Sequence, residues 1–110
     1  MSAHFRIRVL ATSGVRLWCA AAGQLTVRTS GALRHELTER CTGASIVVLD
    51  VREIQLPADS ALLPPPWPDG PHTIHLLATT DLRSRVPADA RVHWHKDLDA
   101  AWQAWSGSFP

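Results

Sequence analysis

Histidine is the residue type whose spacing in this chain most readily suggests chemistry. His93 and His95 lie two positions apart in a segment that reads as a β-strand, so both side chains should point to the same face. His72 and His75 stand at the start of the strand predicted before it. Because imidazole is the commonest metal ligand, three of these rings could hold a transition-metal ion. The alternative is a group of solvent-facing or hydrogen-bonded histidines.

The other reactive residue types do not form a recognisable catalytic motif. Cys19 and Cys41 fall on different predicted elements and lack the spacing of a zinc or redox motif. Cysteine is among the most frequently buried residues, so we expect both thiols in the core. The sequence has no phosphate-binding glycine loop, dinucleotide fingerprint or nucleophile elbow. We therefore expect a protein that is not an enzyme and that needs no cofactor.

The amino-acid composition and net charge indicate the class of protein. Of the 110 residues, 45% are hydrophobic and 19% are charged, which is typical of one globular domain spanning residues 1–110. The formal net charge of +1 gives no electrostatic footprint for nucleic acid or a membrane surface. The first residues lack the apolar run of a signal peptide, and no apolar segment has the length of a membrane span. We expect a cytoplasmic protein whose oligomeric state is open.

The first half of the chain predicts a sheet built around one buried strand. Residues 5–9 and 15–19 alternate in polarity across a Thr-Ser-Gly turn, which predicts an antiparallel hairpin. Residues 30–42 repeat apolar side chains at helical spacing. Residues 44–51 include four consecutive apolar residues, the pattern of a strand covered on both faces. Strand, helix and strand with short connections imply a right-handed crossover between parallel strands.

The second half begins with a proline-rich loop at residues 57–71. Proline lacks an amide donor and fixes φ, so no helix fits there beyond one turn at residues 58–63. Beyond this loop the pattern predicts strands at residues 72–79 and 91–95, with a helical turn between them at residues 80–85. An amphipathic helix is predicted at residues 97–105. The predicted fold class is α/β, with a mixed four- to five-stranded sheet and helices packed on it.

Four short motifs, in this order of elements, resemble the STAS domain. This is the fold of bacterial anti-sigma factor antagonists and of the cytoplasmic tails of sulfate transporters. The first motif, at residues 23–26, ends the hairpin, and the second, at residues 32–37, lies in the first helix. The third, at residues 43–51, is the buried strand, and the fourth, at residues 92–105, includes the last strand and helix. The resemblance covers about residues 5–105. It implies a regulatory protein–protein interaction module whose partner is an anti-sigma factor kinase or a similar protein.

The chain departs from the family in the segment after the buried strand. In the antagonists this strand leads to Asp-Ser-Ser-Gly or Asp-Ser-Thr-Gly, whose first serine is phosphorylated by the partner kinase. An ungapped alignment puts Ala58, Asp59, Ser60 and Ala61 at those four positions. The phosphoacceptor position then holds an aspartate. The proline-rich loop stands where the family has a helix that docks on the kinase.

Three interpretations of this segment are open. Asp59 could imitate a permanently phosphorylated state, although it carries one charge against nearly two on phosphoserine. A slip of one residue in the alignment would instead make Ser60 the phosphorylated residue. In the third interpretation the loop has diverged, and Asp59 caps a helical turn after Pro57.

Trp67 is the remaining candidate contact residue. An aromatic ring on a stiff proline-rich loop suits an interface, because little entropy is lost on docking it. Alternatively it covers sheet surface that the missing helix would leave bare. We expect a regulator acting by partner switching in bacterial transcription control. The alternatives are an unphosphorylated STAS subunit of a transporter or signalling complex, and a histidine-based metal-binding protein.

Overall fold

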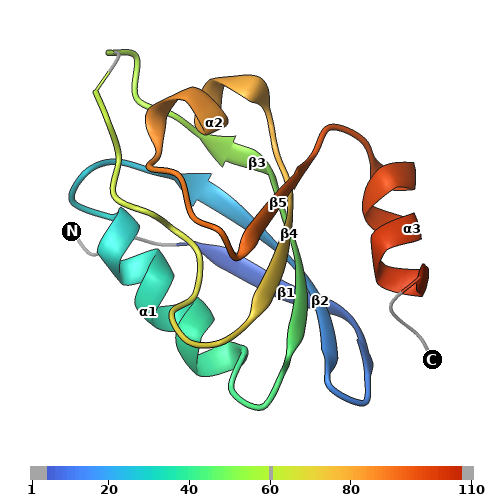
Figure 1. Cartoon of the computed structure of the whole chain (residues 1–110). Helices are drawn as coiled ribbons and strands as arrows, with labels where there is room; N and C mark the ends of the chain where they lie inside the picture. The colour runs from blue at the N-terminus through green and yellow to red at the C-terminus, as the bar shows by residue number, and fades with distance from the viewer. Residues whose placement is uncertain (1–4, 60, 108–110) are drawn as a thin grey trace.

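A computed structural model describes residues 5–59 and 61–107 of the chain. In this part of the chain, five strands form one sheet in the order β1-β2-β3-β4-β5 (Figure 1). The elements follow each other as β1 (Arg6–Ser13), β2 (Arg16–Gln24), α1 (Ser30–Arg40), β3 (Ile46–Gln55), β4 (Thr73–Leu77), α2 (Thr80–Arg85), β5 (Val92–His95) and α3 (Leu98–Gly107). The predicted α/β class with a mixed sheet is confirmed.

The sheet combines one antiparallel hairpin with three parallel pairings. β1 pairs antiparallel with β2, and Gly14 in their turn has a φ of 59°, which glycine adopts without steric cost. The pairs β2–β3, β3–β4 and β4–β5 are all parallel. The crossover from β2 through α1 to β3 therefore has the parallel geometry that the sequence predicts.

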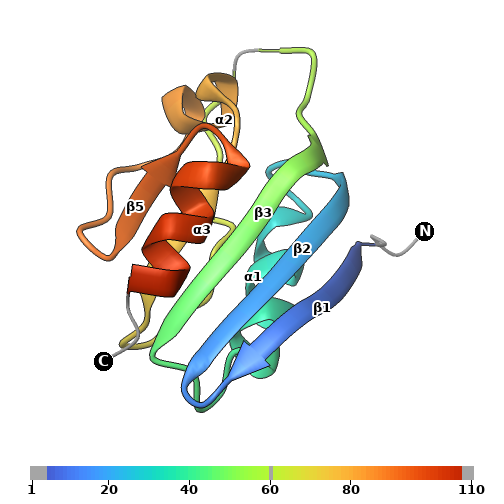
Figure 2. The same cartoon turned by 90° about the vertical axis from the view of Figure 1, so that its right-hand side faces the viewer.

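Both faces of the sheet are covered, by different helices. Figure 2 shows α3 on one side of the sheet and α1 on the other. On the α1 side, Leu33 and Leu37 belong to the larger core. On the α3 side, the smaller core consists of Trp18, Val48, Leu77, Ala101 and Trp105. The central strand β3 serves both cores, and its residues 47–49 have an exposed fraction of 0%. This confirms the prediction of a strand buried on both faces.

The last helix forms as predicted, but only part of its apolar face is buried. Asp97 caps it, because its Oδ1 accepts a hydrogen bond of 2.8 Å from the backbone N of Ala100. Trp105 is buried, whereas Leu98 and Trp102 are 49% and 55% exposed. α3 packs over β3, β4 and β5, and the Trp102 ring lies beside that of Trp18 in β2, with centroids 5.9 Å apart. The apolar face of the predicted amphipathic helix therefore contributes Trp105 to the core and leaves Trp102 partly exposed.

The chain between β3 and β4 forms neither helix nor strand in its described residues. The predicted turn of helix at residues 58–63 is absent from the described part of that segment. Leu63 and Trp67 instead extend from the loop into the larger core, with exposed fractions of 3% and 1%. None of the helices in the described ranges combines the length and apolar character needed to cross a membrane.

Candidate functional site

The candidate partner-binding segment lies beyond the end of β3, where that strand extends past its neighbour β4. β3 pairs with β2 as far as Gln55, but it pairs with β4 only as far as Asp50. Residues 51–55 therefore extend past the β4 ladder by about 17 Å, at about 3.3 Å per residue. The segment that follows lies at the outer rim of the molecule, near the top of Figure 1.

The candidate residues at this rim are partly accessible. Ala58 and Asp59 are exposed and Ala61 is half-buried, whereas Ser60 lies outside the described residues. Asp59 Oδ1 accepts a hydrogen bond of 3.2 Å from the backbone N of Ala61. This i to i+2 bond is an Asx turn, and the described residues that follow, from Ala61 to Pro66, form no helix. The helical turn that the third interpretation has Asp59 cap is therefore absent from the described residues.

Arg85, at the end of α2, holds both ends of this segment. Its Nη1 donates a 2.8 Å hydrogen bond to the backbone O of Pro57. Its own backbone O accepts one of 2.7 Å from the N of Leu63. An ion pair of 3.3 Å between its Nε and Asp81 Oδ1 orients the guanidinium. The segment is therefore fixed at residues 57 and 63, while Asp59 and Leu62 between them are exposed.

An apolar side chain accompanies the charge of Asp59 on this segment. Leu62 is 76% exposed, although its neighbour Leu63 is buried at 3% exposure. Single exposed apolar side chains are common on protein surfaces, and Leu62 is the most exposed of the large apolar residues in the described part of the chain. The sequence analysis did not single out Leu62, because adjacent leucines give no sign of which one is anchored.

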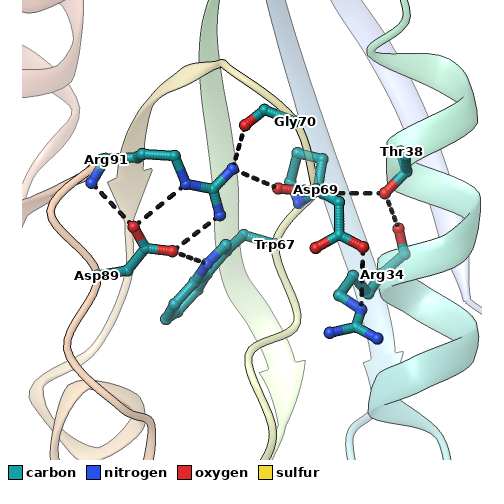
Figure 3. A network of polar contacts seen from close by, with 8 residues as sticks. Arg34, Thr38, Trp67, Asp69, Gly70, Asp89 and Arg91 are labelled. Atoms are coloured by element: carbon teal, nitrogen blue, oxygen red, sulfur yellow. Dashed lines mark hydrogen bonds and ion pairs between the residues drawn. The ribbon is translucent and has the colours of Figure 1, made fainter.

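Trp67 lies inside the fold and not on its surface. Its ring is 1% exposed and meets Trp94 of β5 edge-to-face, with ring centroids 6.1 Å apart. The indole Nε1 donates a 2.9 Å hydrogen bond to Asp89 Oδ2 (Figure 3). Of the two roles considered for Trp67, the structure shows the second, because the ring covers the face of the sheet. The ring is not available as an interface anchor.

Asp89 and Arg91 connect the proline-rich loop to the entry of β5. Arg91 donates from Nη2 to Asp89 Oδ2 at 2.8 Å and from Nε to Oδ1 at 3.2 Å. These hydrogen bonds hold the pKa of Asp89 well below its usual range. The Nη1 of Arg91 donates to the backbone oxygens of Pro68 and Gly70 (Figure 3). The guanidinium thus satisfies carbonyls that a helix would have satisfied internally.

The same loop is attached to α1 from its other side. The backbone N of Asp69 donates a 3.0 Å hydrogen bond to Thr38 Oγ1. Its carboxylate Oδ2 lies 3.6 Å from Arg34 Nε in an exposed ion pair. Side chains from α1 and from the β5 entry therefore fix the loop on the sheet face where the resemblance implies a helix (Figure 3).

The histidines divide between the two faces of the sheet. His72 is 7% exposed, and its Nδ1 donates a 2.6 Å hydrogen bond to the backbone O of Ala44. His75, His93 and His95 instead form a cluster: the ring of His75 lies 5.1 Å from that of His93 and 5.2 Å from that of His95. Over the described ranges, no three ligating side chains are arranged to hold a metal ion. The three-histidine site considered from the sequence is therefore not formed in this structure.

The two cysteines are brought together by the fold. Both are free thiols with an exposed fraction of 0%. Cys19 lies in β2 and Cys41 caps the end of α1. A hydrogen bond with Cys41 and burial raise the pKa of Cys19. As predicted, the thiols are core residues, and their mutual contact is a further finding.

Comparison with known proteins yields a structural match. No protein-family model and no curated protein matches the sequence significantly. The fold is similar to that of an anti-sigma factor antagonist from Mycobacterium paratuberculosis, known from a crystal structure, with a TM-score of 0.55 and 14% sequence identity. The match covers 92% of this chain and 93% of that chain. The chain therefore has the STAS-like α/β fold of an anti-sigma factor antagonist.

Proposed function

We propose that this protein is a regulatory protein–protein interaction module that acts by partner switching in bacterial transcription control. The fold likeness to an anti-sigma factor antagonist supports a regulatory, non-catalytic role at the level of the class. The observation that carries the proposal is the rim segment after β3, which is anchored at residues 57 and 63 and exposed at Asp59. The partner is an anti-sigma factor kinase or a similar protein in the cytoplasm.

The charge at position 59 is the feature expected to control binding. An aspartate places one negative charge where an antagonist of this class carries its phosphoacceptor serine, so it imitates the phosphorylated state weakly. If the alignment slips by one residue, Ser60 accepts the phosphate next to a charge that is already present. In both cases the electrostatics of residues 58–61 decide whether the partner binds.

The test replaces the charge without changing the shape. Asp59→Asn keeps an oxygen that can accept the bond from Ala61, so the Asx turn persists while the charge is lost. Asp99→Asn, an exposed residue on α3, is the matched control. Affinity for each anti-sigma factor of the host is measured by calorimetry. We expect Asp59→Asn to change one affinity by at least about tenfold, while Asp99→Asn changes it less than about twofold.

The direction of the change distinguishes the interpretations. Tighter binding by Asp59→Asn indicates a phosphate mimic, and weaker binding indicates a direct contact. Incubation with the kinase and ATP, followed by mass spectrometry of the Ser60 peptide, tests the slipped alignment. If no anti-sigma factor binds either the parent or Asp59→Asn, the proposal is wrong.

The exposed Leu62 favours a second candidate function, an unphosphorylated subunit of a transporter or signalling complex. Its 76% exposure provides an apolar contact that needs no charge switch, in place of the buried Trp67. Leu62→Ser should then abolish complex formation in co-purification without lowering Tm. Val27→Ser, at a position that is 56% exposed in the loop before α1, is the control.

A further inference from the structure

We propose that the part of the sheet left uncovered beside α3 is a docking surface for an amphipathic helix of a partner protein, with acidic side chains along one flank of that helix. This open face consists of Arg6, Arg8 and Ala11 from β1 with Trp18, Ala20 and Ala22 from β2. It is distinct from the rim segment, so the inference goes beyond the proposed function. It follows from strand register, from the shape of the surface and from its charges.

α3 covers only part of its side of the sheet. The helix packs over β3, β4 and β5, and Figure 2 shows β2 and β1 next to it with no described helix above them. On the α1 side, β2 contributes Leu17, Cys19 and Ala21 to the larger core. In the described part of the chain, β3 is therefore covered by a helix on both faces, whereas β1 and the second half of β2 are covered on one face only.

The strand register identifies the side chains of the open face. Successive side chains of a strand point to opposite faces, and Trp18 belongs to the core on the α3 side. Ala20 and Ala22 therefore point to the same side as Trp18. In the antiparallel ladder Arg8 pairs with Ala20 and Arg6 pairs with Ala22, so both arginines also lie on the open face.

The open face is recessed next to α3 and has the width of a helix. Ala20 is 8% exposed and Ala22 is half-buried, so this floor lies below the longer side chains around it. Neighbouring strands are about 4.8 Å apart, so β1 and β2 together form a floor about 10 Å wide, close to the diameter of an α-helix. A helix placed there would extend the layer that α3 begins.

The side of α3 that borders the open face is apolar. Trp102 is 55% exposed, and its ring lies beside that of Trp18, with centroids 5.9 Å apart. Leu98, which is 49% exposed, lies four residues earlier and therefore on the same side of the helix. Tryptophan is enriched among the residues that contribute most to binding. The apolar ridge of a docked helix would cover these two side chains.

The charges on the open face favour an acidic occupant. Arg6 and Arg8 are exposed, and neither forms an ion pair within residues 5–59 and 61–107. They share a shallow hollow with Glu53, which offsets only one of the two positive charges. Asp50 offsets neither, because it is paired with Arg52 at 2.9 Å. Acidic side chains on the docked helix complement this excess, whereas basic ones would be repelled.

The experiment uses two synthetic peptides as probes. Each has about 18 residues, which as a helix is about 27 Å long and matches the length of the two strands. Both carry leucine and alanine at i, i+3, i+4 and i+7 spacing; one has glutamate along its flank and the other has lysine at the same positions. Fluorescence anisotropy measures their affinity at an ionic strength of about 0.05 M. We expect the acidic peptide to bind at least about tenfold more tightly.

Variants of the open face locate the binding. Arg6→Gln combined with Arg8→Gln should weaken binding of the acidic peptide at least about fivefold, because the complementary charge is lost. Arg28→Gln combined with Arg83→Gln is the matched control, since it removes the same net charge from exposed positions outside the open face. Ala11→Trp, at an exposed position of β1, should block the floor and abolish binding without a change of charge.

Four results would overturn the proposal. These are no saturable binding of the acidic peptide, equal affinities of the two peptides, equal losses in the two double variants, and full binding by Ala11→Trp. Thermal melts identify variants that fail to fold, and the double variant of Arg6 and Arg8 is then decisive, because both side chains are exposed.

Sedimentation velocity of the protein alone tests a different occupant. A dimer that forms as concentration rises, and that Ala11→Trp abolishes, would assign the open face to a second copy of this chain and overturn the proposal. A monomer at all concentrations supports a different protein as the occupant. No anti-sigma factor takes part in these measurements, so their failure leaves the proposed role of the rim segment unaffected.

Discussion

Trp67 and Asp89 are joined by a 2.9 Å hydrogen bond between residues 22 positions apart in the chain. The bond links the proline-rich loop to the entry of β5, and Arg91 fixes the carboxylate from the other side. The loop therefore relies on distant side chains for its position, whereas a helix at the same place would satisfy its backbone internally.

Replacing Trp67 should destabilise the fold strongly. Trp67→Ala removes a ring that is 1% exposed, leaves a cavity and takes one hydrogen bond from the Asp89 carboxylate, which keeps those from Arg91, at a cost of about 3–5 kcal/mol. Trp102→Ala, at a 55% exposed position, should cost about 1 kcal/mol or less. Urea unfolding followed by circular dichroism measures both. Equal costs would mean that the Trp67 ring does not belong to the core.

Loss of the Arg85 side chain should loosen the rim segment. Arg85→Ala removes the bond to the Pro57 oxygen and the ion pair with Asp81, but keeps the backbone bond to Leu63. We expect proteolysis next to the exposed Leu62 to become several-fold faster, since cleavage needs local opening. Arg83→Ala is the control on the same helix. Equal cleavage rates in the two variants would contradict the role of Arg85.

The His75 side chain should make the fold sensitive to mild acid. Its folded-state pKa of about 4 lies below the ordinary imidazole pKa of 6.5, so the unfolded chain binds more protons between these pH values. Its contribution is complete above pH 6.5 and is lost as pH falls towards 4. After allowance for partial exposure, this is about 1–2 kcal/mol. His75→Gln should flatten the dependence of unfolding free energy on pH, while His35→Gln should not.

Both thiols should be inert until the protein unfolds. Cys19 and Cys41 have 0% exposure, so a reagent reaches neither thiol in the folded protein. Contact with Cys41 and burial raise the pKa of Cys19, whereas contact with Cys19 lowers the pKa of Cys41, so burial is what protects both thiols. A disulfide reagent should therefore react at the rate of global opening and accelerate with added urea. In a Val9→Cys variant, at a position that is 48% exposed, the new thiol should react at once. Rapid labelling of the native parent would show that the core opens locally.

The strands and helices were largely predictable because their signals are local. The Ile-Val-Val-Leu run predicts the central strand β3, and both bounds of α2 agree with the predicted residues 80–85. The overhang of β3 as far as Gln55 was not predicted. Its last residues, Val-Arg-Glu-Ile-Gln, mix polar and apolar side chains without a regular period and pair only with β2, so they give no continuous apolar signal.

The histidine cluster and the loop contacts depend on tertiary geometry. Periodicity places His93 and His95 on one face, but only the β4–β5 register decides that His75 joins them. His72 lies just before β4, and its Nδ1 donates to the backbone O of Ala44, away from the histidine cluster. The bond of Trp67 to Asp89 spans 22 residues, and no local pattern encodes it. The sequence alone therefore allows two roles for Trp67, a cover over the sheet or an interface anchor, and it does not decide between them.

The overhang of β3 also separates the rim segment from the histidine cluster in space. His75 lies level with Val48, and Gln55 is seven residues further along the same strand, which is about 23 Å at about 3.3 Å per residue. A protein bound at the tip of this strand therefore has no steric reason to touch the histidine rings. Substitutions in the two regions can be combined freely, because neither should disturb the other.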